Sequence, residues 1–136
     1  MNAKQRTIAI LVLVMSLVIS GCRPPIPKGV VKGVLIGAND LPFPAGVQVI
    51  PSSWDEAEQM CTVNNDQIKK LVFTDTSGAF TFTDIPAGKY CLVLFLESEG
   101  TIGSINTSNN QIFIFEVNDA SGVDLGKVSV VGVRLP

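Results

Sequence analysis

The sequence predicts an all-β fold in which two sheets pack face to face as a sandwich. From Val30 onward, short runs of β-branched and aromatic residues are divided by clusters of Gly, Pro, Asn and Asp. Several runs alternate apolar and polar residues with the period of two that a half-buried strand shows. Strands at this spacing with turn signals between them are typical of a β-sandwich, and little of the chain has a helical pattern.

Seven strands account for the alternating runs. Between the third and fourth, Asp75 and Gly78 suit the tight turn of a hairpin. A polar loop is expected over residues 98–110. The predicted strands cover residues 30–36, 47–50, 68–74, 79–83, 89–97, 111–117 and 125–133.

The pattern breaks after the second strand, over residues 52–67. There Ser53 and Glu56 have the spacing of a helix capping box, ahead of Ala57 and Met60. We therefore expect a short helix or an ordered excursion in this segment.

The N-terminal segment has the pattern of a secretory signal. Lys4 and Arg6 precede an apolar run over residues 8–19. A membrane-spanning helix needs roughly 20 apolar residues, so this run is too short for an ordinary anchor. We expect residues 1–21 to be a signal peptide that is removed.

The end of this segment, Ile19-Ser20-Gly21-Cys22, resembles the lipobox of bacterial lipoproteins. The resemblance implies cleavage before Cys22 and acylation of its thiol, with palmitate among the acyl chains. An ordinary signal with an incidental cysteine is the alternative. An Asp directly after the cysteine would resemble the signal that retains lipoproteins in the inner membrane. This chain has Arg23 at that position, which favours delivery to the outer membrane. The expected location is the outer membrane of a two-membrane cell or the outer face of a single membrane.

Residues 22–28 are expected to form a tether, because three prolines in five positions favour an extended, polyproline-like spacer. Removal of residues 1–21 leaves about 115 residues, enough for one core but too few for two, so we expect residues 29–136 to make one domain.

Charge excludes some partners. Lys4 and Arg6 are the only charged residues of the signal, so the rest of the chain has 8 Lys and Arg against 12 Asp and Glu, a formal balance of −4. Nucleic-acid binding relies on clustered basic residues and is therefore disfavoured. Attraction to anionic lipid is disfavoured as well, which leaves Cys22 as the expected membrane anchor. No cofactor is indicated.

The chain has three cysteines, and acylation would use Cys22. The other two, Cys61 and Cys91, would mature in an exported compartment, which is oxidising. A disulfide is the favoured interpretation, with two separate buried thiols as the alternative. A metal site is disfavoured, because two cysteines in a chain without histidine make a poor zinc ligand set.

The predicted strand over residues 89–97 is apolar on both faces. Its even-numbered residues are expected in the sandwich interior, whereas Cys91, Val93 and Phe95 lie on the other face. We expect the excursion to cover that face as a flap, held by a bond from Cys61 to Cys91. The alternative is an exposed apolar patch that binds a partner.

The central sequence TDTSGAFTFTDIPAGKY, residues 74–90, resembles the signature of carboxypeptidase regulatory-like domains. These domains belong to the transthyretin-like group of Ig-type sandwiches. Residues 31–34, 44–49 and 123–126 fit the same family. The resemblance implies an Ig/transthyretin-like β-sandwich, and it leaves function open because such modules occur in many exported proteins with unrelated partners.

The isopeptide-bonded adhesin domains of Gram-positive surface proteins are also similar around residues 80–90. Their cross-link needs a lysine in the first strand, an Asn or Asp in the last, and a buried acid. Lys32 suits the first role, but Leu92 and Leu94 stand where the acid is expected, and residues 125–133 contain no Asn or Asp. We therefore expect Lys32 to be an edge or surface residue.

Catalysis is disfavoured because the chain has no histidine, which excludes Ser-His-Asp and Cys-His arrangements. Transthyretin-like hydroxyisourate hydrolases resemble this fold but depend on histidines. Pairs of carboxylates could serve a glycosidase. The better interpretation is solvated surface charge for all of them: Asp55, Glu56, Glu58, Glu97 and Glu99.

The favoured function is therefore a non-catalytic, lipid-anchored interaction or structural module of the cell envelope, with a protein or glycan partner. Candidate contacts are the loop over residues 98–110 and Trp54, whose ring could stack on a sugar or instead pack under the flap. The alternative function is a small-molecule carrier or weak hydrolase that uses a cleft between sheet and flap.

Overall fold

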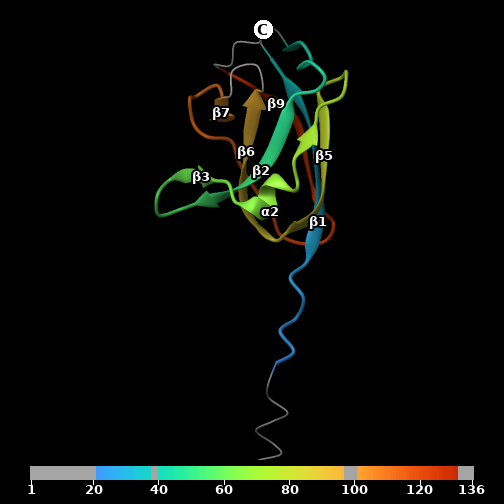
Figure 1. Ribbon diagram of the computed structural model, residues 1–136, viewed down its shortest axis with the longest axis vertical. Helices are drawn as coiled ribbons and strands as arrows, with labels where there is room; N and C mark the ends of the chain where they lie inside the picture. The colour runs from blue at the N-terminus through green and yellow to red at the C-terminus, as the bar shows by residue number, and fades with distance from the viewer. Residues whose placement is uncertain (1–20, 38–39, 97–100, 132–136) are drawn as a thin grey trace, which may run out of the picture.

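The computed structural model describes residues 21–37, 40–96 and 101–131, which form two packed β-sheets. Figure 1 shows the sheets face to face, with the chain before the first strand running away from the sandwich. The expected all-β sandwich is confirmed. The predicted signal over residues 1–21 lies almost wholly outside the described residues, and within them no helix is long and apolar enough to cross a membrane.

The smaller sheet has three strands, with β1 (Lys28–Ile36) at its centre. On one side β1 pairs antiparallel with β5 (Ala79–Pro86). On the other side it pairs in parallel with β9 (Val123–Ser129), from the far end of the chain. Direct pairing between β1 and β9 therefore joins the N-terminal and C-terminal parts of the domain.

The larger sheet is built on the antiparallel pair of β2 and β6, and each of these has two further partners. β3 and β4 pair with β2, whereas β7 and β8 pair with β6. Its strands are β2 (Gln48–Asp55), β3 (Met60–Thr62), β4 (Val72–Phe73), β6 (Gly88–Leu96), β7 (Thr101–Ser104) and β8 (Ile114–Val117).

The described residues thus contain nine strands, two more than predicted. β3 lies in the predicted excursion and β7 in the predicted polar loop over residues 98–110, and both are short edge strands that add to a neighbour already formed. Such a strand shows little alternation of its own. The third predicted strand, residues 68–74, is reduced to the two residues of β4.

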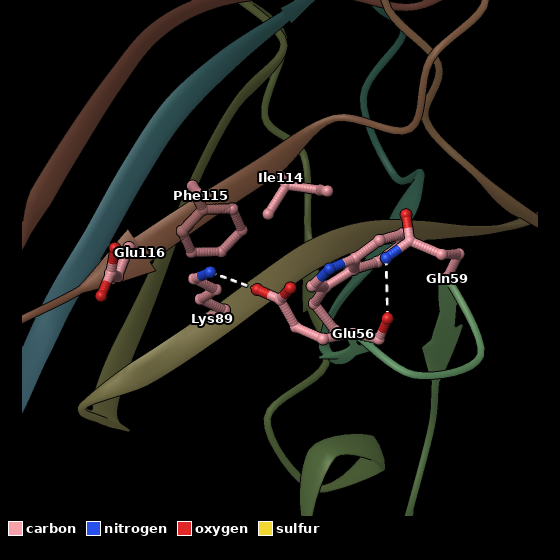
Figure 2. Close-up of a pocket in the computed structure, with 7 residues that line it drawn as sticks. Glu56, Gln59, Lys89, Ile114, Phe115 and Glu116 are labelled. Carbon is pink, nitrogen blue, oxygen red and sulfur yellow. Dashed lines mark hydrogen bonds and ion pairs between the residues drawn. The ribbon is translucent and has the colours of Figure 1, made fainter.

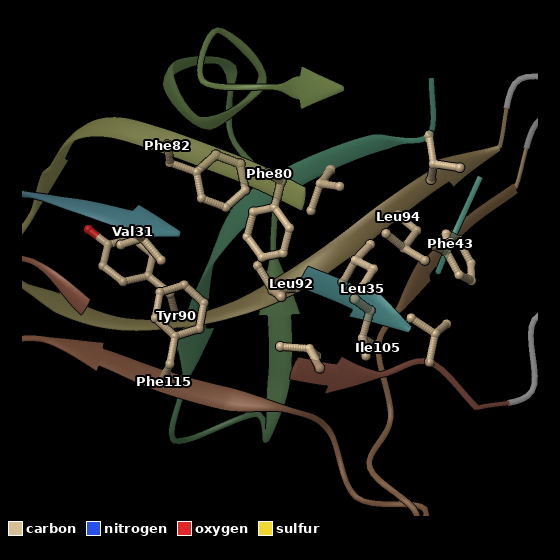
Figure 3. Close-up of a cluster of buried hydrophobic side chains, with 14 of the residues drawn as sticks. Val31, Leu35, Phe43, Phe80, Phe82, Tyr90, Leu92, Leu94, Ile105 and Phe115 are labelled. Carbon is tan, nitrogen blue, oxygen red and sulfur yellow. The ribbon is translucent and has the colours of Figure 1, made fainter. Parts of the chain in front are cut away.

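The core fills the space between the sheets, as Figure 3 shows. Phe80 and Phe82 of β5 enter it from one sheet, and alternate residues of β6 enter it from the other, as the period of two predicts. The core comprises Val31, Leu35, Phe43, Val47, Val49, Phe80, Phe82, Ile85, Tyr90, Leu92, Leu94, Ile105, Phe115, Val117, Val128 and Val130.

The turn at Asp75–Gly78 does not close a hairpin, contrary to the prediction, because β4 belongs to the larger sheet and β5 to the smaller. The local signals are nevertheless real. The Asp75 carboxylate accepts hydrogen bonds from the Ser77 and Ala79 backbone amides at 2.8 and 2.9 Å. Gly78 has a φ of +77°, and its carbonyl accepts a hydrogen bond from the Leu35 amide at 2.8 Å. The same residues that suit a hairpin turn here carry the chain between sheets.

The excursion after β2 is a β-hairpin followed by a short helix, α2 (Asn65–Ile68). A capping box is present, but its members are Asn64 and Gln67 rather than Ser53 and Glu56. Gln67 is also buried and donates from Nε2 to Ser53 Oγ. Ser53 extends β2 instead of capping a helix, because pairing with β6 offers its backbone a ladder partner.

Candidate functional site

The hairpin of β2 and β3 extends past the body of the larger sheet. Pairing between β2 and β6 ends at Ser53, opposite Tyr90, whereas β2 pairs with β3 from Ser53 to Asp55. Figure 1 shows this hairpin standing out from the side of the sandwich. We refer to residues 54–62 as the projecting hairpin.

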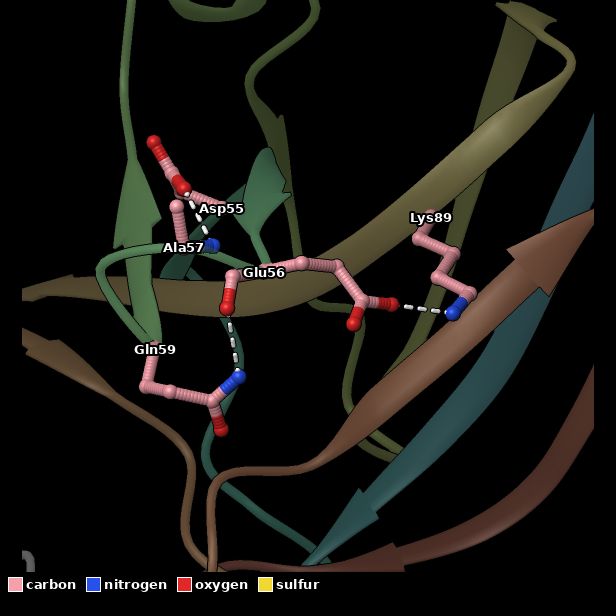
Figure 4. Close-up of polar contacts among 5 residues, drawn as sticks. All are labelled: Asp55, Glu56, Ala57, Gln59 and Lys89. Atoms are coloured by element: carbon pink, nitrogen blue, oxygen red, sulfur yellow. Dashed lines mark hydrogen bonds and ion pairs between the residues drawn. The ribbon is translucent and has the colours of Figure 1, made fainter.

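The tip of the projecting hairpin is closed by its own side chains (Figure 4). The Asp55 carboxylate accepts hydrogen bonds from the backbone amides of Ala57 and Glu58 at 2.9 and 3.1 Å. Gln59, with a φ of 52°, donates from Nε2 to the Glu56 carbonyl at 2.7 Å. This Asx-type closure defines the turn and leaves the Glu56 carboxylate free to reach the body of the sheet.

A disulfide joins Cys61 of β3 to Cys91 of β6, which confirms the predicted pairing. The bridge passes over β2 on the outer face of the larger sheet. Cys61 is the cross-strand partner of Trp54, and Cys91 that of both Ser52 and Ile114. Because residues two apart on a strand share a face, the bridge lies between Trp54 and Ile114.

The outer face beside the bridge is buried. Cys91 is 0% exposed and Val93 2%, while Phe95 is partly buried. The alternative of an exposed patch at Val93 is therefore wrong. Met60 is 49% exposed, so the projecting hairpin contributes its disulfide to this face but does not lay Met60 over it.

A groove of about 380 Å³ lies between the projecting hairpin and the body of the sheet (Figure 2). One wall belongs to the hairpin and the other to β6 and β8. Its lining residues are Trp54, Glu56, Gln59, Lys89, Ile114, Phe115 and Glu116.

An ion pair joins the two walls of the groove. Lys89 Nζ donates to the Glu56 carboxylate, which links the hairpin to β6. Glu116 faces Lys89 across the β6–β8 pair. The hydrogen bond and charge of Glu56 raise the pKa of Lys89, and the charge of Glu116 adds to the effect. The groove therefore offers two carboxylates, one ammonium group and the Gln59 amide.

Trp54 is partly exposed and lines this groove. Of the two interpretations of Trp54, the structure shows a ring that borders solvent rather than one enclosed beneath a flap.

Glu56 was considered from the sequence only as a catalytic or surface carboxylate, and the remaining lining residues were not singled out as site residues. Lys89 is two residues from Cys91 on the same strand, so alternation alone places both on the outer face of the sheet. Ile114 and Glu116 reach the groove only through the register between β6 and β8, which the sequence does not reveal.

Two of the carboxylates considered for acid–base catalysis have structural partners. Asp55 closes the hairpin tip, and Glu56 is paired with Lys89. Glu97 and Glu99 lie outside the described residues. Among the residues that the structure does describe, no three His, Cys, Asp or Glu side chains gather as a metal-binding group.

Lys32 lies on the surface, as expected, but not at a sheet edge, because β1 is the central strand of the smaller sheet. It forms an ion pair with Asp124 of β9 at 3.2 Å. Both side chains are about 60% exposed, at 62% and 60%. The last strand thus does contain an acidic residue, because β9 begins earlier than predicted.

No family model and no curated protein matches the chain. Similar solved structures include the Bacillus cereus major pilin subunit BcpA, at 16% identity and a TM-score of 0.46, covering 76% of this chain and 30% of that one. A streptococcal ancillary pilin has 14% identity and a TM-score of 0.48, covering 76% and 32%. Klebsiella pneumoniae 5-hydroxyisourate hydrolase has 17% identity and a TM-score of 0.40, covering 77% and 88%. The chain thus spans about a third of the pilins' length.

Proposed function

We propose that this protein is a lipid-anchored, non-catalytic module of the cell envelope that binds a glycan in the groove beside Trp54. The observation that carries the proposal is the composition of that groove. A partly exposed indole lies beside a carboxamide and three charged groups within one hollow of about 380 Å³. Sites for small ligands combine an apolar surface with a few polar groups that fix orientation.

A sugar ring matches these groups. Its C–H face can stack on the indole of Trp54, while its hydroxyls can hydrogen-bond to planar acceptors and donors at the rim. Gln59 and Glu116 are such groups, because neither carboxylate oxygen of Glu116 nor the Gln59 Oε1 is used by another side chain of the described residues. A glycan therefore uses both the apolar and the polar part of the groove.

The proposed anchor is the acylated thiol of Cys22, which is exposed. Residues 21–27 have no regular secondary structure, and β1 begins at Lys28. At the polyproline rise of about 3.1 Å per residue, the six steps from Cys22 to Lys28 reach roughly 19 Å. Such a tether keeps the groove near the envelope surface. We also assign the sandwich to the carboxypeptidase regulatory-like type, on the resemblance of residues 74–90.

A glycan array tests the binding proposal with the parent protein, Trp54→Ala and Phe73→Ala. Phe73 is the matched control, because it is an aromatic residue of the same sheet, 60% exposed and outside the groove. The parent and Phe73→Ala should share their bound glycans, and Trp54→Ala should lose them. Equal binding by all three proteins, or by none, would contradict the proposal.

Anchoring has its own test. Expression of the full chain and of Cys22→Ala, followed by membrane fractionation and mass analysis, should show the parent acylated and in the membrane fraction. Cys22→Ala should be unacylated and leave that fraction. An unmodified Cys22 in the membrane-bound parent would refute the lipid anchor while leaving the groove untouched.

A small-molecule carrier is the second candidate, since the groove lies between the projecting hairpin and the body of the sheet. Native mass spectrometry of the purified protein distinguishes the two. A bound metabolite that is absent from Trp54→Ala supports the carrier, whereas glycan binding by a protein free of metabolites supports the envelope module.

A further inference from the structure

The two walls of the groove belong to parts of the chain that are joined by few contacts. Trp54, Glu56 and Gln59 lie on the projecting hairpin, whereas Lys89 and Glu116 lie on β6 and β8. Beyond Ser53, the described residues show no β-ladder between the hairpin and the rest of the sheet. Its own ladder consists of three residue pairs, and an isolated two-stranded hairpin is at best marginally stable in water.

Within the part of the chain that the structure describes, two side-chain links tie the hairpin back to the sheet. One is the ion pair of Glu56 and Lys89, whose side chains are 61% and 49% exposed. Exposed pairs of this kind contribute little and are weakened by salt. The other is the disulfide, which connects the last strand of the hairpin to the centre of β6. The covalent link is therefore the main restraint on the distance between the two walls.

Each cysteine of the disulfide neighbours one wall of the groove. Cys61 is paired with Trp54, and Cys91 is paired with Ile114, so each sulfur atom belongs to a residue directly opposite a lining residue. Neither cysteine lines the groove itself. A change at the bridge can thus reach a ligand only by moving the walls.

We propose that the Cys61–Cys91 bridge is a redox-sensitive clamp that assembles the groove, so that the oxidised protein binds its ligand and the reduced protein does not. The inference rests on the proposed function for its ligand. The state of the projecting hairpin is a separate observable that needs no ligand.

The reaction is thiol–disulfide exchange with a dithiol reductant. A thiolate of the dithiol attacks Sγ of Cys61, which is partly exposed, and Cys91 Sγ leaves as a thiolate. The second thiol of the reductant then displaces Cys61, and two protons complete the two protein thiols while the reductant becomes a disulfide. Cys91 Sγ lies 3.6 Å from the Ser52 carbonyl oxygen, which can accept the hydrogen of the new buried thiol.

Ligand binding and the bridge should be coupled in both directions. If the oxidised form binds more tightly by a given factor, the ligand must favour the oxidised form by the same factor. Saturating ligand should therefore shift the reduction equilibrium of the bridge. This reciprocity gives a second readout of the same coupling.

The experiment compares the oxidised parent, the same protein reduced with dithiothreitol, and Cys61→Ser. Hydrogen exchange followed by mass spectrometry reports on residues 54–62 and, as an internal reference, on β1 and β5. A titration with an N-acetylglucosamine tetramer, together with the best glycan from the array, reports on binding. Phe73→Ala in both redox states controls for a general loss of stability.

We expect faster exchange of residues 54–62 in the reduced protein and in Cys61→Ser, with β1 and β5 unchanged, and binding weaker by at least about tenfold. Unchanged hairpin exchange on reduction, or equal affinity of both redox states, would overturn the clamp. Absence of binding by every form would refute the proposed function instead, and the hairpin exchange alone would then decide the clamp.

Discussion

Trp54 and Cys61 lie directly opposite each other on β2 and β3, which places the only tryptophan of the chain beside the bridge to Cys91. Indole emission therefore reports on the two features that matter most for the groove, the state of the disulfide and the presence of a ligand.

Reduction of the bridge should increase the fluorescence of Trp54. A disulfide quenches an excited indole that it contacts, and a pair of free thiols quenches it less. The emission of the oxidised protein, recorded before and after addition of dithiothreitol, checks this. Cys61→Ser should be bright from the start and insensitive to the reductant. An equal response in Cys61→Ser would place the quencher elsewhere.

Loss of the bridge should also lower the free energy of unfolding. The two cysteines are 30 residues apart, and in the chain-entropy model a loop of this size contributes about 3 to 4 kcal/mol. Urea unfolding of the parent and of Cys61→Ala/Cys91→Ala measures the difference. A change below about 1 kcal/mol would mean that the unfolded chain gains little freedom from opening the loop.

Ser52 and Ser53 should respond to alanine in opposite directions. Ser52 is 0% exposed, and its hydroxyl has no hydrogen-bond partner in the described structure, so Ser52→Ala should stabilise the protein by up to about 1 kcal/mol. Ser53 accepts a hydrogen bond from the buried side chain of Gln67. Ser53→Ala should destabilise by about 1 kcal/mol, since it leaves Gln67 short of a partner. Thermal unfolding of the two variants checks the sign of each change.

Gly78 should be far less tolerant of alanine than Gly46. Both have positive φ values, +77° and +84°, and this alone costs about 1 to 2 kcal/mol for a residue with a Cβ. At Gly78 the new Cβ would also clash with the Leu35 carbonyl oxygen, whereas the space at Gly46 is open. Gly78→Ala should exceed Gly46→Ala in destabilisation by about 1 kcal/mol or more. Equal effects would show that the Gly78 turn relaxes away from β1.

Acid should destabilise the fold through two exposed turn carboxylates. The pKa of Asp75 is held below its ordinary value of 3.8, mainly by the Ser77 hydroxyl, and that of Asp119 is lowered mainly by the Ser121 hydroxyl. A lowered folded-state pKa gives stability that is complete above 3.8 and is lost as the pH falls through the lowered value. Urea unfolding between about pH 5 and pH 2 should show a smaller loss in Asp75→Asn/Asp119→Asn than in the parent. An identical pH profile would contradict the assignment.

The sequence by itself determined the features that depend on local chemistry. Alternation along β5 and β6 places Phe82 and Leu92 in the core, because neighbouring residues of a strand must face opposite sides. Cysteine count and the apolar outer face of β6 predicted the bridge from Cys61 to Cys91. The turn chemistry at Asp75 was also readable, since its hydrogen bonds span only a few residues.

Only the tertiary structure decided which sheet each strand joins and which residues share the groove. Whether Asp75 begins a hairpin or a crossing between sheets depends on the partners of β4 and β5, which lie elsewhere in the chain. Ser53 could cap a helix or extend a strand, and the ladder offered by β6 decides for the strand. The pairing of β2 with β6 also brings Glu56 close to Lys89. Strands that are far apart in the sequence pair because the complete core is then buried. The free energy of that burial depends on all the segments together, so it cannot be read from any one of them.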